Sequence, residues 1–265
     1  MGKIISVANQ KGGVGKTTTS VNISASIASK GKKVLLVDLD PQGNATSGVG
    51  IDKGAVNSSV YDLISNNAQV NDVIKKTDFK NLYILPSNIS LAGAEIEMVD
   101  MENRMFKIKD ILTPIKKDYD YIFIDCPPSL GLITLNALSA SDSLLVPIQC
   151  EFYALEGLSQ LMMTVRTVKR LYNNNLEIEG VLLTMYDGRL NLTVQVANEV
   201  KKYFPDKVYK TVIPRNVRLS EAPSFGQPVL YFDHLSKGAN SYLDLADEII
   251  LWGDFKKLCL IKKKG

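Results

Sequence analysis

A glycine-rich loop that ends in lysine and threonine carries the clearest chemical signal in the sequence. Residues 11–18 read Lys-Gly-Gly-Val-Gly-Lys-Thr-Thr, directly after an apolar run at residues 4–8 and at the start of a helical pattern over residues 16–30. Glycines let backbone N–H groups converge on phosphate oxygens, and a helix N-terminus adds a favourable dipole. The segment therefore predicts a nucleotide phosphate site whose contacts are Lys11, Gly12, Gly13, Val14, Gly15, Lys16, Thr17 and Thr18.

Two lysines of this loop have different expected tasks. Lys16 precedes a threonine in the Gly-Lys-Thr pattern, so it is expected to reach the β- and γ-phosphates, while the Thr17 hydroxyl ligates Mg²⁺. The standard pattern would place its first glycine at position 10, where this chain has Gln10, and Lys11 is an additional cation. Lys11 is either a solvated loop charge or a second phosphate contact, which could serve a nucleotide in a facing subunit.

Carboxylates follow two further apolar runs. Asp125 directly follows the apolar run at residues 121–124. An acid at the end of an apolar strand is typical of a residue that holds Mg²⁺ directly or through water. Asp38 and Asp40 end the run at residues 34–37, where they could orient the attacking water or ligate metal. The alternative for both is strand-end solvation or helix capping. Cys126 is expected to be a packed thiol.

Alternating strand and helix patterns predict how these residues are positioned. Apolar runs occur at residues 4–8, 34–37, 82–85, 121–124, 143–147 and 181–183, with residues 212–213 as a further short candidate. Continuous runs are typical of strands buried on both faces of a parallel sheet. Helical patterns occur at residues 16–30, 153–172 and 237–252, and residues 41–80 are expected to form loops and short helices.

These patterns predict an α/β fold, a single-domain P-loop NTPase with a mostly parallel twisted sheet and helices on both faces. We expect the domain to span residues 1–252 and a short basic, partly apolar tail to span residues 253–265. One histidine, His234, excludes histidine-rich zinc sites, and three widely spaced cysteines favour a reducing compartment. The sequence contains neither a transmembrane run nor a signal peptide, so a cytoplasmic protein is expected.

The motifs together resemble one known family. The loop at residues 11–18 resembles the deviant Walker A sequence of ParA/MinD ATPases, and residues 37–44 (Val-Asp-Leu-Asp-Pro-Gln-Gly-Asn) and 124–130 (Ile-Asp-Cys-Pro-Pro-Ser-Leu) resemble its other nucleotide motifs. Residues 147–158, 184–191 and 213–224 resemble the chromosomal ParA (Soj) branch. The resemblance extends from residue 3 to about residue 250.

This resemblance implies a Mg²⁺-dependent ATPase that partitions chromosomes or plasmids. In the family, ATP drives formation of a sandwich homodimer, which binds double-stranded DNA without sequence preference, and a ParB-type centromere-binding partner stimulates hydrolysis and release. The protein would then be associated with the nucleoid. Carried onto this chain, the catalytic residues are Lys11, Lys16 and Asp40, the metal residues are Thr17 and Asp125, the adenine contacts are Pro214 and Asn216, and the DNA contacts are Arg189 and Arg218.

The C-terminal tail leaves other functions open. The chain has a formal net charge of +3. The five lysines after residue 254 contribute +5, so the rest of the chain carries a net charge of −2. As a helix, the tail would place Phe255, Leu258 and Cys259 on one face, which is typical of a basic amphipathic membrane contact. A MinD-like, membrane-associated cell-division ATPase is therefore the alternative function. A reductase or small-molecule ligase on the same fold is a further one, although Cys126 has no evident partner for a metal cluster.

Overall fold

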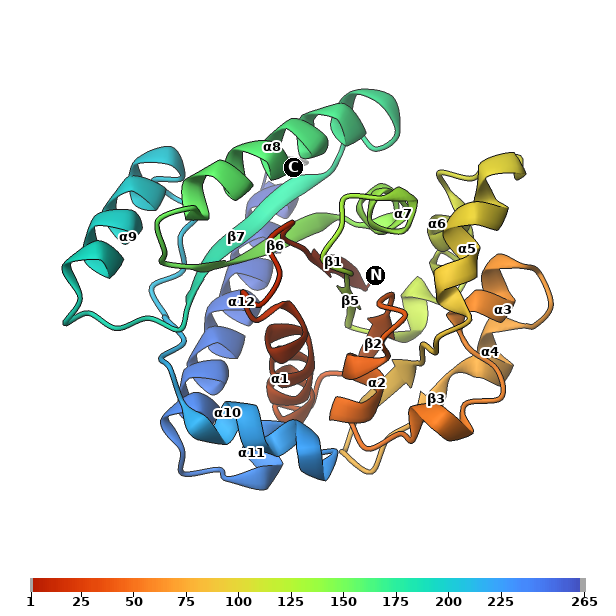
Figure 1. The fold of residues 1–265 in the computed structure, drawn as a ribbon, viewed down its shortest axis with the longest axis horizontal. Helices are drawn as coiled ribbons and strands as arrows, with labels where there is room; N and C mark the ends of the chain where they lie inside the picture. The colour runs from red at the N-terminus through yellow and green to blue at the C-terminus, as the bar shows by residue number, and fades with distance from the viewer. Residues whose placement is uncertain (1, 263–265) are drawn as a thin grey trace.

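Seven strands form one twisted sheet in the computed structural model, which describes residues 2–262, with side chains up to residue 253. The strand order is β3-β4-β2-β5-β1-β6-β7, and the strands pass through the centre of the molecule (Figure 1). The strands are β1 (Lys3–Val7), β2 (Val34–Asp38), β3 (Lys75–Lys76), β4 (Leu82–Leu85), β5 (Tyr121–Asp125), β6 (Ser143–Gln149) and β7 (Glu177–Thr184).

The parallel register brings the expected site residues to one edge of the sheet. All strand pairs are parallel except β3 with β4, which is antiparallel. Asp125 at the end of β5 is level with Val7 of β1 on one side and with Asp38 of β2 on the other. Because parallel strands end at the same edge, the loop that follows β1 and the acids that end β2 and β5 meet there.

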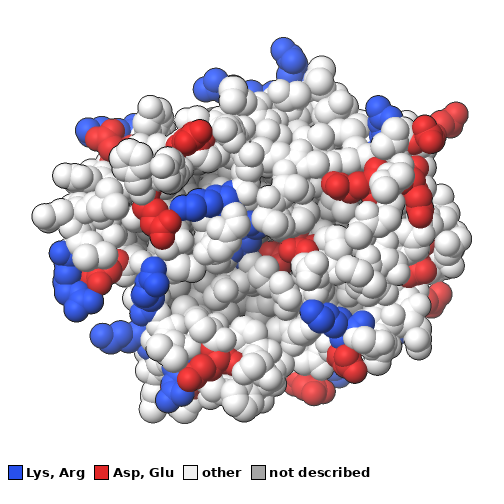
Figure 2. Space-filling view, viewed as in Figure 1, with Lys and Arg blue, Asp and Glu red and all other residues white. Residues whose placement is uncertain are grey.

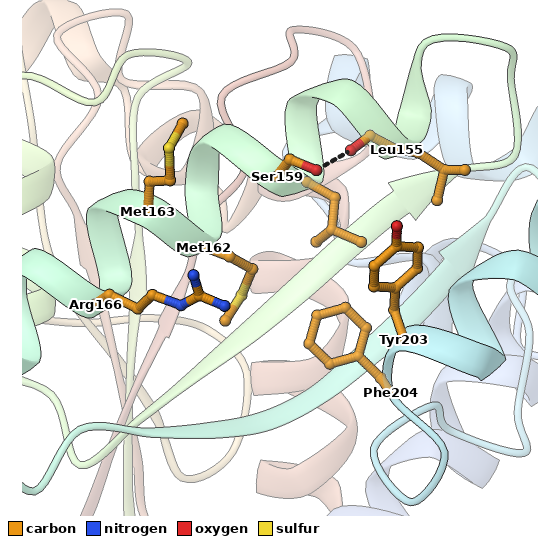
Figure 3. A pocket seen from close by; sticks show the side chains of 8 residues that line it. Leu155, Ser159, Met162, Met163, Arg166, Tyr203 and Phe204 are labelled. Carbon is orange, nitrogen blue, oxygen red and sulfur yellow. Dashed lines mark hydrogen bonds between the residues drawn. The ribbon is translucent and has the colours of Figure 1, made fainter.

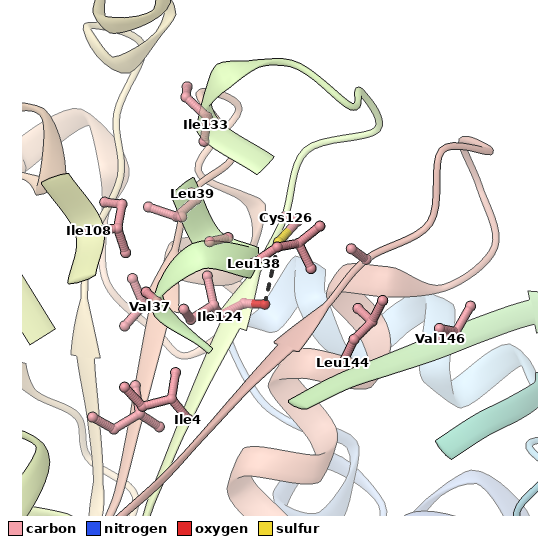
Figure 4. Packing of buried hydrophobic residues seen from close by; sticks show 14 of the residues in the cluster. Ile4, Val37, Leu39, Ile108, Ile124, Cys126, Ile133, Leu138, Leu144 and Val146 are labelled. Atoms are coloured by element: carbon pink, nitrogen blue, oxygen red, sulfur yellow. Dashed lines mark hydrogen bonds between the residues drawn. The ribbon is translucent and has the colours of Figure 1, made fainter. Parts of the chain in front are cut away.

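Helices cover both faces of the sheet. One face packs against α3 (Val60–Ile64), α4 (Val70–Val73), α5 (Leu91–Glu97), α6 (Lys107–Leu112), α7 (Leu132–Ala140), α8 (Ala154–Leu171) and α9 (Asn191–Tyr203). The other packs against α1 (Lys16–Ser29), α2 (Asn44–Gly48), α10 (Val217–Glu221), α11 (Val229–Phe232) and α12 (Lys237–Lys262). The strands alternate between the two cores, since Leu35 and Val37 enter the first and Val34 and Leu36 the second. Figure 4 shows part of the first core, where Val37 of β2 and Ile124 of β5 pack together with Ile108 of α6.

The six stronger strand predictions and the three helix predictions are confirmed, and the sheet and its helices match the predicted fold class. Residues 212–213 are not a strand, which corrects the weakest expectation. The segment that contains them runs beside β7 and makes only isolated hydrogen bonds with it. Tyr209 N donates to Val181 O (3.0 Å), and Ile213 N donates to Leu183 O (2.9 Å). Pro214 has no N–H to extend the pairing. The two-residue strand β3 was not anticipated.

The last helix, α12, connects the C-terminal region to the phosphate-loop helix. Tyr242 shares a buried hydrogen bond with Thr19 of α1 (3.1 Å), and Asp247 pairs with Lys30 at the other end of α1 (2.8 Å). The α12 backbone continues as a helix through the expected boundary at residue 252, while the apolar face expected at residues 255–259 lies outside the described side chains. Within residues 2–262, no helix has the length and apolar character needed to cross a membrane.

Candidate nucleotide site and neighbouring surfaces

The phosphate loop connects the end of β1 to the start of α1. Gly13 and Gly15 have φ values of +72° and +84°, in the left-handed region that favours glycine, and Gly15 is the N-cap of α1. Thr184 Oγ1 at the end of β7 donates to Val14 O (2.8 Å), and Lys11 N donates to Asn9 Oδ1 (3.0 Å). The loop is therefore fixed by side chains on both sides, with the first N–H groups of α1 at its end.

Lys16 is a buried cation at the base of this loop. It is 7% exposed, and its Nζ donates to Lys11 O (3.1 Å). Burial lowers the pKa of Lys16, while the negative charge of Asp125 opposes this shift. A buried ammonium close to helix N–H groups favours an anionic ligand, so the position of Lys16 suits a phosphate group.

Asp125 lies opposite the start of α1 and is fully buried. Its Oδ1 accepts a hydrogen bond from Ser20 Oγ (2.8 Å), whereas its Oδ2 is buried with no hydrogen-bond partner. Burial, followed by the neighbouring Asp38, raises the pKa of Asp125 to about 8, although hydrogen bonds from Ser20 and Thr17 pull it down. An unpartnered buried carboxylate oxygen beside a threonine hydroxyl fits the oxygen ligands that Mg²⁺ prefers.

The donor set also fits magnesium better than a metal held in an all-protein cage. No group of three or more histidine, cysteine, aspartate or glutamate side chains within the described part of the chain could hold a metal ion. Mg²⁺ is usually held by one or two protein oxygens, several waters and the phosphates of its nucleotide. Asp125 and Thr17 would supply such a pair.

Asp38 and Asp40 differ in their surroundings although they lie two residues apart. Asp38 is buried, and its Oδ2 accepts hydrogen bonds from Thr46 N and Thr46 Oγ1 (both 2.8 Å). Burial raises its pKa to about 6. These contacts favour the capping alternative for Asp38, since they hold α2 against the sheet. Asp40 is half-buried, and its Oδ1 accepts from Gln42 N (2.9 Å), leaving its second oxygen without a described hydrogen bond.

Lys11 makes an ion pair within its own chain. Its Nζ lies 2.7 Å from Glu151 Oε2, in the segment between β6 and α8. Both side chains are partly exposed. An exposed pair of this kind contributes little free energy and can exchange partners. Lys11 is therefore available to bind a phosphate. That it contacts the nucleotide of a facing subunit stays a prediction.

Pro214 and Asn216 lie beside the end of β7, the strand whose Thr184 holds the phosphate loop. Pro214 forms an isolated parallel bridge with Tyr186, and Asn216 is the N-cap of α10, accepting from Arg218 N (3.0 Å). The structure thus brings this segment close to the same sheet edge as the loop. The expected adenine contacts are not tested by these bonds and stay a prediction.

The two arginines expected to contact DNA are exposed and already paired. Arg189 donates from Nε and Nη2 to the two oxygens of Asp187 (2.9 and 2.7 Å). Arg218 pairs with Glu221 (2.8 Å) and with Asp233 (3.1 Å). Their side chains are 89% and 51% exposed. On the face of the molecule that Figure 2 shows, Lys or Arg and Asp or Glu side chains are interspersed, with both signs around the hollow near its centre.

Two hollows have distinct surroundings. One, of about 400 Å³, lies between α1, α2 and the 3₁₀ turn Ala222–Phe225, and Thr17 and Thr18 line it, so it opens beside the phosphate loop. The other, of about 350 Å³, is an apolar groove between α8 and α9, where Leu155 and Tyr203 face one another across the gap (Figure 3). Its lining residues include none of the expected site residues.

Four residues that the motifs did not identify support the site. Ser20 lies one turn after Thr17, and this i, i+3 spacing could have indicated that both face the same acid. Thr46, Thr184 and Glu151 are contributed by other segments. Their roles depend on tertiary contacts, for which the local sequence gives no signal.

The chain matches a family model and is similar to known proteins over most of its length. A family model described as an AAA domain matches residues 2–178. The sporulation initiation inhibitor protein Soj of Bacillus subtilis is 63% identical over 249 residues, covering 94% of this chain and 98% of that protein. The chromosome partitioning protein ParA of Myxococcus xanthus is 51% identical over 250 residues, covering 94% and 88%.

Solved structures share the fold. The structure described as cobyrinic acid a,c-diamide synthase from Mycobacterium smegmatis, with bound ADP and magnesium, matches with a TM-score of 0.83 and 36% identity, covering 94% of both chains. The cell division ATPase MinD of Pyrococcus furiosus matches with a TM-score of 0.80 and 28% identity, covering 95% of this chain and all of that one.

Proposed function

This chain belongs to the ParA/MinD family of P-loop ATPases, on the Soj branch, and on that premise we propose that it is the ATP-dependent switch of a DNA-partitioning system. One observation carries the proposal. The phosphate loop with its two lysines faces a buried carboxylate that has one oxygen without a hydrogen-bond partner, in a chain that is similar to partitioning proteins over 94% of its length.

The residues of the site divide the work of ATP hydrolysis between them. Bound Mg²⁺–ATP supplies the phosphoryl group and a divalent charge. Lys16 and the loop N–H groups bind the phosphates, and Thr17 and Asp125 hold the metal. Asp40 orients the attacking water through the carboxylate oxygen that Gln42 leaves free. Phosphoryl transfer needs positioning and charge stabilisation more than covalent help, which this set of side chains provides.

The nucleotide also assembles the active form of the protein. ATP binding draws two subunits together face to face, and Lys11 leaves Glu151 to contact the phosphates of the facing subunit. Pro214 and Asn216 contact the adenine. The ion pair that Lys11 gives up is exposed, so its loss costs roughly 1 kcal/mol or less. Phosphate contacts of the ATP-bound dimer can offset this cost.

The assembled dimer binds double-stranded DNA through its phosphates. Arg189 and Arg218 are exposed, and no motif for reading base edges accompanies them. Binding would be independent of sequence and steeply dependent on salt. A ParB-type centromere-binding protein stimulates hydrolysis and releases the DNA. We accordingly propose a cytoplasmic, nucleoid-associated protein.

Two other functions have weaker support. A MinD-like role at the membrane rests on the basic tail and on the 28% identity to the Pyrococcus furiosus protein, against 63% to Soj. A metabolic role rests on the Mycobacterium smegmatis structure at 36% identity.

Nucleotide-dependent retention on DNA separates these functions. Two unrelated 60-bp duplexes are each titrated with protein in ATP, in ADP and without nucleotide, and vesicles of anionic lipid are titrated in parallel. The proposal expects ATP-dependent binding to both duplexes, weakened by Arg218→Ala and kept when residues 254–265 are deleted. ATP-dependent vesicle binding that this deletion abolishes, without DNA binding, would support the MinD-like role instead.

A further inference from the structure

The loop after β7 and the segment before α10 lie side by side. Tyr186 N donates to Ile213 O (2.9 Å), and Tyr186 forms a parallel bridge with Pro214. The next residue in each segment is charged, Asp187 in one and Arg215 in the other. The backbone pairing therefore places an acid and an arginine next to each other at this edge.

Asp187 is already engaged by a second arginine. Its Oδ1 accepts from the Nε and the backbone N of Arg189 (2.9 and 3.1 Å), and its Oδ2 accepts from Nη2 (2.7 Å). Hydrogen bonds from Arg189 lower the pKa of Asp187 to about 2, and the charge of Arg215 adds to the shift. Asp187 thus remains a carboxylate between two guanidinium groups.

Arg215 differs from its two neighbours in the surface. Arg189 is held by Asp187, and Arg218 by Glu221 and Asp233, whereas Arg215 is exposed and makes no ion pair with the described residues. The fork geometry of a guanidinium binds a carboxylate or a phosphate in the same bidentate manner. A phosphate that binds the Nε–Nη2 edge of Arg189 must therefore displace Asp187, while a phosphate that reaches Arg215 displaces no partner.

We propose that Asp187 is an intramolecular competitor for phosphate on the DNA-binding surface and that Arg215 is a third phosphate contact beside Arg189 and Arg218. The ligand is the phosphate backbone of double-stranded nucleic acid, so the inference rests on the proposed DNA-binding function. Asp187 weakens the contact twice, because it occupies Arg189 in the free chain and repels a bound phosphate afterwards. Arg215 lies between Pro214 and Asn216, so the same segment carries the expected adenine contacts.

A set of matched variants tests both parts. A fluorescein-labelled 30-bp duplex is titrated in ATP with the wild-type chain, Asp187→Asn, Asp206→Asn and Arg215→Ala. Asp206 is exposed and makes no ion pair with the described residues, so its variant changes the net charge equally without releasing an arginine. We expect Asp187→Asn to bind about 2- to 5-fold more tightly than Asp206→Asn, the range of an exposed ion pair. Arg215→Ala should bind several-fold more weakly than wild type.

A double variant tests whether the change in DNA affinity depends on the ion pair between Asp187 and Arg189. When Arg189→Ala is combined with Asp187→Asn, most of the gain from Asp187→Asn should be lost, because Arg189 no longer has a guanidinium to release and only the weaker repulsion of phosphate by Asp187 is relieved. Equal affinities for Asp187→Asn and Asp206→Asn, or wild-type affinity for Arg215→Ala, would overturn the inference while Arg218→Ala still weakened binding. A wild-type chain that bound no DNA in ATP would overturn the proposed function together with it.

Discussion

The phosphate site and the arginine surface use charge in opposite ways. Lys16 and Asp125 are almost wholly buried, and Asp125 keeps an oxygen without a hydrogen-bond partner. Arg189 and Arg218 are largely exposed, and each is paired with a carboxylate of its own chain. Charges in the interior are costly unless they are paired, whereas exposed ion pairs contribute little. Ligand binding at the phosphate site should therefore be strongly favourable, because it compensates buried charges. On the arginine surface, a bound phosphate only replaces a weak ion pair.

This contrast predicts where substitutions have large effects. Removing a buried charge should abolish activity and leave the fold as stable as before or more so, because the charge is unfavourable without its ligand. Removing an exposed arginine should change affinity by a modest factor and leave both hydrolysis and stability nearly unchanged.

Lys16→Met should reduce ATP hydrolysis by roughly 10²-fold or more, because it removes the buried cation that we propose to stabilise the transferring phosphoryl group. The melting temperature without nucleotide should not fall, since an apolar side chain of similar length replaces a buried ammonium. Steady-state hydrolysis and a thermal melt measure the two effects. Lys117→Met, at an exposed lysine, is the control. A variant that kept near-wild-type hydrolysis would show that Lys16 is not part of the site.

The raised pKa of Asp125 predicts that the nucleotide-free chain loses stability as pH rises. A carboxyl group with a pKa of about 8 in the folded state and about 4 when unfolded holds its proton more tightly when folded. Its contribution is complete at low pH and is lost as pH rises towards 8, by roughly 3–4 kcal/mol between pH 5 and pH 8. Urea unfolding at several pH values measures this slope. In Asp125→Asn most of the slope should disappear, and an unchanged slope would contradict the assignment.

Arg218→Ala should weaken DNA binding about 3- to 10-fold, equally for unrelated duplexes, and reduce the salt dependence by about one phosphate contact. Glu221 and Asp233 then lose their partner but remain close to solvent, so the free energy of unfolding should change by less than about 0.5 kcal/mol. Titrations over a range of salt concentrations measure the slope. A sequence-dependent loss of affinity would indicate base contacts instead.

Glu151→Gln should have the smallest effect, because it removes only the exposed partner of Lys11. If Lys11 must leave Glu151 to serve a facing subunit, the ATP concentration for half-maximal hydrolysis should fall by up to about 5-fold, with little change in kcat. Glu156→Gln, at an exposed glutamate of the same helix region, provides the comparison. A fall in kcat without a change at half-saturation would contradict the release of Lys11.

The sequence predicted the phosphate site more completely than the arginine surface. Lys16, Thr17 and Asp125 belong to local patterns in which strand, loop and helix determine one another, and the parallel register brings them to one edge. The role of Asp38 was less clear, since its partner Thr46 is fixed by the packing of α2. The pairing of Arg189 with Asp187 is local, but the position of Arg215 beside them follows from a bridge between residues 186 and 214. Such bridges depend on tertiary structure, which residue spacing does not encode.

The proposed function requires that nucleotide bound at the buried phosphate site controls DNA binding at the exposed arginine surface. A direct test is the affinity for a duplex of arbitrary sequence. It is measured in ATP, in ADP and without nucleotide, for both the wild-type chain and Lys16→Met. We expect tight binding only for the wild-type chain in ATP, and weak, nucleotide-independent binding for Lys16→Met. Equal affinity of the wild-type chain in all three conditions, or ATP-dependent binding by Lys16→Met, would contradict it.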